Sequence, residues 1–220
     1  MQSIQGLYRN APSWVRLYVR YRIPLFDVDL LACFLPETGS IIDLGCGYGV
    51  LANLLATTNP NWRVTGIDLN RKRIEVAQST VKGRTNIAFQ VGDARTGLPQ
   101  ADAIIMTDFL HHLKVPDQNT LLEVVYQKLR LGSSLILLEA STRPFWRSVM
   151  SGLSDWILYP FQEKAHFRSP EDMTATMEAI GFQSQIFDRP SAIFAGIGYH
   201  CVKADNEKGP AQGVASTGSL

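Results

Sequence analysis

The order of apolar and polar positions changes period repeatedly between residues 40 and 140. Short continuous apolar runs are typical of buried strands, and apolar positions three and four apart are typical of helices with one buried face. The predicted strands are 40–44, 63–69, 86–91, 103–107 and 134–140. The predicted helices between them are 50–58, 71–81 and 117–131. This alternation predicts a parallel sheet covered on both faces, a doubly wound α/β fold.

A helix and two strands follow. Ser169-Pro170-Glu171-Asp172 combines a capping box with proline at the first helical position, and it predicts a helix that ends at Gly181. Strands 182–187 and 193–202 are separated by a short link, so we expect an antiparallel pair at the sheet edge. The whole is a seven-stranded, mostly parallel sheet with an antiparallel last strand.

Two aromatic segments lie outside this alternation, and we expect both to be helical. The first, within an N-terminal cap of residues 1–37, has one apolar face: Trp14, Leu17, Tyr18 and Tyr21. The second, in an inserted segment of residues 143–168, has the stripe Trp146, Val149, Met150, Leu153, Trp156 and Ile157. Such stripes are usually ordinary core. The alternative is a lid over a ligand crevice of the main domain, residues 38–203.

Composition bounds the class of protein. The 220 residues are 45% hydrophobic and 19% charged, enough for one sizeable core, and the formal charge of +1 disfavours a nucleic-acid partner. Cys33, Cys46 and Cys201 are isolated, which excludes a CxxC zinc site and favours a reducing, cytoplasmic location. Residues 204–220 have few large apolar side chains and are expected to form a disordered tail.

The basic charge is concentrated at the start of the chain. Residues 1–26 hold four arginines and no acid, and no apolar run is long enough for a signal peptide, although a transit peptide would also be arginine-rich. The arginines of the first helix, such as Arg16 and Arg20, fit a solvated surface. They also fit peripheral contact with an anionic membrane or with a carrier protein.

A glycine turn follows the first strand, in the run from Asp43 to Gly49. Glycines between a strand and a helix let backbone N–H groups approach a ligand closely. A nicotinamide-binding loop has the spacing GxGxxG around a pyrophosphate, whereas this loop has GxGxG preceded by Asp43. A carboxylate repels a pyrophosphate and attracts an ammonium group. The loop therefore favours a ligand with a positive amine and no phosphate.

Acidic residues also end the next two strands. Asp68 can accept hydrogen bonds from ribose hydroxyls, and Asp93 can accept one from an adenine amine. The simpler interpretation is that strand-end aspartates cap the helices that follow. Three such acids beside a glycine loop favour a ligand crevice above the sheet.

These motifs resemble the class I S-adenosylmethionine-dependent methyltransferases, and most of all their small-molecule branch that includes the quinone C-methyltransferases. The matching runs are 43–49, 66–68, 92–94 and 102–113. The resemblance implies S-adenosylmethionine as cofactor, and the residues it assigns to cofactor binding are Asp43, Gly45, Cys46, Gly47, Asp68, Leu69, Asp93, Ala94, Met106 and Thr107. Leu131-Gly132-Ser133 departs from the usual Pro-Gly-Gly turn. The acidic cluster of the magnesium-dependent catechol enzymes was not found.

His111 and His112 follow the fourth strand, near the expected position of the methyl group. Histidine titrates near neutrality and could act as a general base, although a His-His pair can also be a packing feature of the fold. Asp108 and His112 have helical spacing but are too few to hold a metal, so no metal is expected. The acceptor pocket is predicted from the aromatic segments: Trp14, Tyr18, Trp146, Met150 and Trp156.

The predicted function is methyl transfer from S-adenosylmethionine to a small hydrophobic or aromatic acceptor, such as a phenol, a quinol or a carrier-bound aryl acid. Three alternatives remain open at this point: a nicotinamide-dependent oxidoreductase, a non-catalytic module that binds the cofactor, and an RNA methyltransferase, which the lack of a broad basic patch disfavours.

Overall fold

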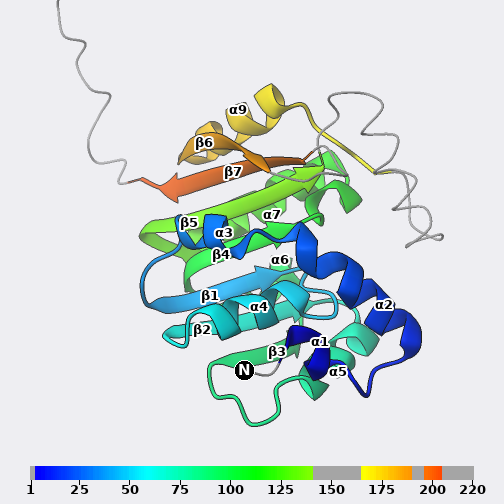
Figure 1. Ribbon diagram of the computed structural model, residues 1–220. Coiled ribbons are helices and arrows are strands. Elements are labelled where there is room, and N and C mark those ends of the chain that lie inside the picture. The colour runs from blue at the N-terminus through cyan, green and yellow to red at the C-terminus, as the bar shows by residue number, and fades with distance from the viewer. Residues whose placement is uncertain (1–2, 141–164, 190–195, 205–220) are drawn as a thin grey trace, which may run out of the picture.

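A seven-stranded sheet forms the centre of the molecule (Figure 1). The computed structural model describes residues 3–140, 165–189 and 196–204. The strand order is β3-β2-β1-β4-β5-β7-β6. The strands are β1 (Gly39–Leu44), β2 (Trp62–Asp68), β3 (Ile87–Val91), β4 (Ala101–Thr107), β5 (Leu129–Ala140), β6 (Phe182–Arg189) and β7 (Gly196–Lys203). β7 runs antiparallel to both of its neighbours, β5 and β6, and the other neighbouring pairs are parallel, which confirms the predicted fold class.

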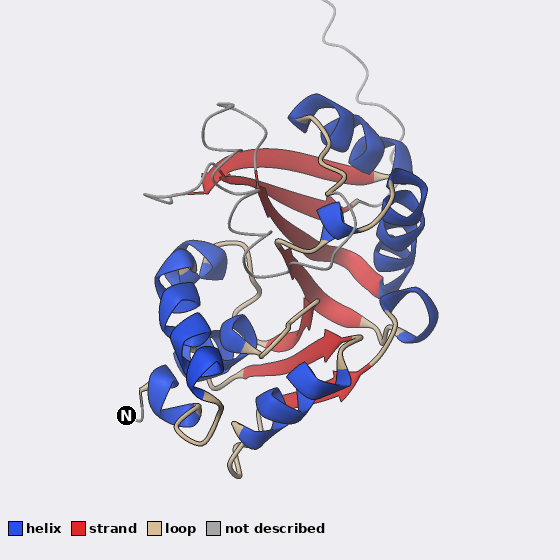
Figure 2. Ribbon diagram, turned by 90° about the vertical axis from the view of Figure 1, so that its right-hand side faces the viewer, coloured by secondary structure: helices blue, strands red, loops and turns tan. Residues whose placement is uncertain are grey.

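Helices cover both faces of the sheet (Figure 2). One face packs against α6 (Ala94–Gly97), α7 (Val115–Lys128) and α9 (Pro170–Ile180). The other packs against α3 (Val28–Ala32), α4 (Val50–Thr58) and α5 (Arg71–Ser79). The remaining helical elements are α1 (Ile4–Leu7), α2 (Ser13–Arg22) and the 3₁₀ turns η1 (Ile23–Leu25) and η2 (Leu110–His112). Within the described ranges, no helix combines the length and hydropathy that a membrane crossing requires.

The N-cap and the C-cap of α9 have the predicted geometry, although the Asp172 side chain pairs with Arg168 and does not complete the capping box. The Ser169 side chain accepts a hydrogen bond from the Asp172 backbone N–H at 3.1 Å, and Pro170 occupies the first turn. Gly181 ends the helix with φ +113°, in the left-handed region that favours glycine.

The helix predicted over 117–131 ends earlier than expected. Residues 129–131 belong to β5 instead, where Leu129 is buried and pairs with Ala101 of β4. Pairing with a neighbouring strand satisfies the backbone that a longer helix would have satisfied internally.

The face that α2 buries is not its aromatic stripe. Val15 and Val19 are buried against α1 and α4, whereas Trp14 is 61% exposed and Leu17 69% exposed. Two small β-branched side chains one turn apart allow the helix to approach its neighbours closely, which the bulkier aromatic face would prevent. The face with Trp14, Leu17, Tyr18 and Tyr21 is therefore not the core-facing side of this helix, and its role as a lid stays a prediction.

The second aromatic segment, with Trp146, Met150 and Trp156, lies outside the described residues, as does the predicted tail from residue 205 onward. The domain boundaries stay predictions.

Candidate functional site

The glycine loop connects the end of β1 to α4. Gly45, Gly47 and Gly49 have φ of +74°, +55° and +74°, in the left-handed region. The backbone N–H groups of Gly45 and Cys46 both donate to the carbonyl oxygen of Ile67, at 2.8 and 3.1 Å. The loop is thereby bonded to the end of β2.

The three glycines meet different surroundings. A Cβ on Gly45 would lie 2.7 Å from the Phe109 ring, and one on Gly49 would lie 2.4 Å from the Phe89 ring. A Cβ on Gly47 would meet no atom within 4 Å. Gly45 and Gly49 are therefore required for packing within the protein, and Gly47 alone faces open space where a ligand can approach.

Asp43 lies beneath this loop. Its side chain is 1% exposed, and its Oδ2 accepts a hydrogen bond from the Ala52 N–H at 3.1 Å. Its Oδ1 is buried without a hydrogen-bond partner among the described residues. Burial raises the pKa of this carboxyl from its ordinary 3.8 to about 7. A buried carboxylate oxygen without a donor is costly, so a positively charged group placed there would be stabilised.

Asp68 ends the neighbouring strand and bonds the loop directly. Its Oδ2 accepts from the Gly47 N–H at 2.9 Å, and its Oδ1 accepts from the Asn70 N–H at 2.8 Å. Each carboxylate oxygen can accept a second hydrogen bond, so the predicted ribose contact remains available. Leu69 beside it is 60% exposed and offers an apolar surface next to the carboxylate.

Asp93 caps α6, as the simpler interpretation of strand-end acids proposed. Its Oδ1 accepts from the Arg95 N–H at 2.9 Å, and its Oδ2 pairs with the Arg95 guanidinium at 2.8 Å. Hydrogen bonds from Arg95 hold the pKa of Asp93 below its ordinary value. An adenine amine would have to share this carboxylate with Arg95. The roles predicted for Asp93 and the buried Ala94 stay predictions.

Met106 and Thr107 end β4 and are both buried. Met106 lies opposite Leu44 in the β1–β4 pairing, which places the ends of the two strands side by side. The chain leaves β1 and β4 toward opposite sides of the sheet, and ligands of doubly wound folds bind in the crevice at such a point. The structure therefore brings Asp43, Asp68 and Met106 to one edge of the sheet.

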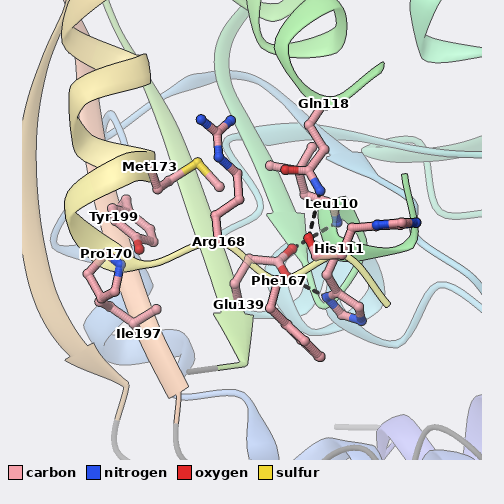
Figure 3. A pocket seen from close by; sticks show the side chains of 11 residues that line it. Leu110, His111, Gln118, Glu139, Phe167, Arg168, Pro170, Met173, Ile197 and Tyr199 are labelled. Atoms are coloured by element: carbon pink, nitrogen blue, oxygen red, sulfur yellow. Dashed lines mark hydrogen bonds and ion pairs between the residues drawn. The ribbon is translucent and has the colours of Figure 1, made fainter. Parts of the chain in front are cut away.

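A buried histidine–carboxylate pair joins the turn after β4 to the end of β5 (Figure 3). The Nδ1 of His111 is 2.5 Å from the Oε2 of Glu139, and both side chains are buried. Glu139 Oε1 accepts from the backbone N–H groups of Phe109 and Leu110, at 3.2 and 2.8 Å. Since a carboxylate only accepts, this contact assigns the His111 proton to Nδ1 and makes Nε2 the basic nitrogen.

Glu139 was not predicted from the sequence. The available signal was a single acid that closes the apolar run 135–138, in a strand buried on both faces. Burial of such an acid requires several donors, and here the turn after β4 supplies them from Phe109, Leu110 and His111.

His112 has a different environment from His111. Burial, and then the neighbouring His111, lower its pKa to about 4. The two rings lie 4.2 Å apart, and the His111 ring stacks on Phe167 with centroids 4.8 Å apart. His111 is therefore the better placed of the two candidates for base chemistry.

The predicted acceptor residues Trp14 and Tyr18 contact the glycine loop. Their rings pack edge-on against Tyr48 at 5.6 and 5.3 Å. At the other end of the helix, Arg22 pairs with Asp108 at 2.9 Å, just after β4. The N-terminal segment therefore touches both sides of the crevice. Its role in an acceptor pocket stays a prediction. No group of three or more potential metal ligands occurs within the described ranges.

Comparison with known proteins agrees with this geometry. Residues 41–132, which contain Asp43, Asp68 and His111, match the family described as "Methyltransferase domain". Over these residues the chain is therefore similar to a methyltransferase domain. The glycine loop and the strand-end acids lie within the matched residues, and their role as a ligand crevice stays a prediction.

Relatives of the methyltransferase domain differ in their reactions. The chain is 29% identical over 125 residues to carboxy-S-adenosyl-L-methionine synthase of Campylobacter curvus. The aligned part covers 53% of this chain and 53% of the relative. It is 32% identical over 108 residues to the ubiquinone/menaquinone biosynthesis C-methyltransferase UbiE of Desulfotalea psychrophila, which is 48% of this chain and 43% of the relative. The chain thus spans about half, or less, of the length of these curated relatives.

Solved structures show the same fold over more of the chain. Magnesium protoporphyrin IX methyltransferase from Synechocystis PCC 6803, solved with bound SAH, superimposes with a TM-score of 0.67 at 19% identity. The match covers 90% of this chain and 91% of that one.

Proposed function

We propose that this chain transfers a methyl group from S-adenosylmethionine to a small hydrophobic or aromatic acceptor. The observation that carries the proposal is the buried Oδ1 of Asp43, which has no donor among the described residues and lies beneath the loop where Gly47 faces open space. An ammonium group of a methionine tail supplies the missing donor. A pyrophosphate would instead meet a buried carboxylate, which disfavours a nicotinamide cofactor.

The residues at the crevice fit this cofactor. Asp43 and Gly47 would hold its methionine part, and Asp68 would accept from its ribose, with Leu69 as an apolar surface beside it. When bound, the sulfonium supplies an already activated methyl group. The protein then has to align the acceptor and exclude water, and it needs a base only where the acceptor must lose a proton.

The His111–Glu139 pair supports an acceptor that loses a proton, such as a phenol or a quinol. Glu139 fixes the ring and stabilises the imidazolium that forms when Nε2 takes a proton. The names of the relatives differ in their acceptors, so they support methyl transfer more than any one substrate. A carrier-bound aryl acid stays within the proposed class.

The test is titration calorimetry with S-adenosylmethionine and its demethylated product, followed by a labelled-methyl screen of quinols, phenols and carrier-bound aryl acids. We expect a Kd in the micromolar range, or about 8 kcal/mol. Asp68→Ala should weaken binding by about 1.5–3 kcal/mol, the value of a charge-assisted hydrogen bond. Asp188→Ala, an exposed acid on β6, is the matched control and should bind normally.

Two results would contradict the proposal. Binding of a nicotinamide cofactor without binding of S-adenosylmethionine would assign the crevice to an oxidoreductase. Cofactor binding without transfer to any acceptor class would favour a non-catalytic module.

A further inference from the structure

The glycine loop needs external support to keep one conformation. Glycine loses more conformational freedom on folding than any other residue, and three of the five residues 45–49 are glycines. The first half of the loop is held by β2, through Ile67 and Asp68. The second half, Tyr48 and Gly49, leads into α4 and is held by residues other than those of β2.

Tyr8, from the N-terminal segment, supplies part of that support. Its side chain is 1% exposed, and its hydroxyl donates to the Tyr48 carbonyl oxygen at 2.8 Å. The same hydroxyl accepts from Asn53 Nδ2 at 2.9 Å, and Asn53 Nδ2 also donates to the Gly49 carbonyl oxygen at 2.8 Å. Two consecutive carbonyl groups of the loop are thereby fixed by one buried pair of side chains.

The orientation of Asn53 is itself fixed. The Arg84 guanidinium donates to Asn53 Oδ1 and, at 3.0 Å, to the Thr80 carbonyl oxygen. Since Oδ1 receives the guanidinium, Nδ2 must face Tyr8 and Gly49. Burial raises the pKa of the Tyr8 phenol above its ordinary value, so the hydroxyl keeps its proton and remains a donor.

The Tyr48 side chain is held by the same segment. Trp14 and Tyr18 pack on its ring, and the Arg73 guanidinium lies over it, 5.8 Å from the centroid. Tyr8, Trp14 and Tyr18 all precede residue 41, where the match to the methyltransferase domain begins. This support comes from outside the matched domain.

We propose that Tyr8 is a positioning residue for the cofactor, acting through the Tyr48 carbonyl group, and that docking of residues 4–25 and cofactor binding strengthen each other. The inference rests on the proposed function. Without the Tyr8 hydroxyl, the Tyr48–Gly49 peptide samples more orientations, and a ligand must order it on binding. Linkage then requires the reverse effect, so a bound ligand stabilises the N-terminal segment.

The experiment compares Tyr8→Phe with the wild-type chain, using the demethylated cofactor S-adenosylhomocysteine as probe in calorimetry, at a temperature where both are folded. We expect Tyr8→Phe to raise the Kd about three- to tenfold, the range of one lost hydrogen bond. Tyr126→Phe makes the same chemical change on α7, where the ring packs on Phe182, and should leave the Kd unchanged. A lower melting temperature with a Kd within about twofold of wild type would mean a purely structural role and overturn the proposal.

Hydrogen exchange measures the reverse effect without any variant. S-adenosylhomocysteine should slow amide exchange in residues 4–25 of the wild-type chain, and less so in Tyr8→Phe, while β6 stays unchanged. Unchanged exchange in residues 4–25 at saturation would overturn the coupling. A wild-type chain that fails to bind the probe would refute the proposed function and this inference together, whereas normal binding with equal Kd values would refute the inference alone.

Discussion

The backbone N–H of Gly47 donates to the Asp68 carboxylate at 2.9 Å, across 21 positions of sequence. This hydrogen bond joins the ends of β1 and β2 and orients the loop over Asp43. An acid predicted as a ligand contact therefore also builds the surface to which the ligand binds.

Gly47→Ala should abolish cofactor binding while the protein stays folded. The new methyl group would enter the open space above the loop, and the left-handed backbone should cost about 1–2 kcal/mol of stability. Gly83→Ala is the matched control, because Gly83 has φ +78° and its Cβ would also meet no atom within 4 Å. Thermal unfolding should show that the two variants are equally destabilised. Calorimetry should show that only Gly47→Ala has lost cofactor binding. Normal binding by Gly47→Ala would place the ligand elsewhere.

Cofactor affinity should rise with pH through neutrality. The folded-state pKa of Asp43 is about 7, so this carboxyl is largely protonated below pH 7 when no ligand is bound. A ligand with an ammonium group favours the ionised carboxylate. Affinity should therefore increase about tenfold from pH 6 to pH 8, with proton release at pH 6. Calorimetry in buffers of different ionisation enthalpy measures both.

Asp43→Asn is the control for this pH effect. The amide oxygen can still accept from the Ala52 N–H, but it cannot ionise. The affinity of Asp43→Asn for the cofactor should be low and should not change with pH. The same raised pKa means that the stability contributed by Asp43 falls as pH rises from about 4 through 7, because the ionised form is the costly one in the fold. A pH-independent wild-type affinity would contradict the assignment.

His111→Gln should slow transfer to a hydroxyl acceptor by about 10²–10⁴-fold, the usual contribution of a general base. Glu139→Gln should act in the same direction, since a neutral amide holds the imidazolium less well. S-adenosylhomocysteine affinity should stay within about twofold in both, because neither residue lies at the glycine loop. His112→Gln is the control, since the pKa of His112 is already lowered to about 4. Full activity in His111→Gln would mean that the His-His pair only packs the turn after β4.

Val15→Ala should destabilise the protein more than Trp14→Ala, although it removes far fewer atoms. Val15 is fully buried, so its truncation leaves a cavity and should cost about 2 kcal/mol. Trp14 is mostly exposed and loses mainly its edge contact with Tyr48, about 1 kcal/mol. Chemical denaturation of both variants measures the order, and the opposite order would mean that the aromatic face is the buried one.

Much of the fold and part of the crevice could be predicted from local sequence. Strand and helix periods, the Ser169 cap and the Gly181 stop depend on residues within a few positions of one another. Asp43 and the loop pattern GxGxG likewise lie in one short run. The strand-end positions of Asp68 and Asp93 followed from the alternation itself, because parallel strands end at one edge of the sheet.

The remaining features depend on contacts between distant residues, which only the tertiary structure decides. The shape of the surface beneath α2 decides which face of the helix is buried. Val15 is therefore buried, and the aromatic stripe that contains Trp14 is not. Glu139 meets His111 because β4 and β5 are neighbours, and Tyr8 reaches Tyr48 because α1 packs beside α4. Local propensity and period in the sequence determined the helices, the strands and the edge of the sheet where the crevice lies. Contacts between residues 28 to 40 positions apart determined which side chains hold the glycine loop and the His111 ring.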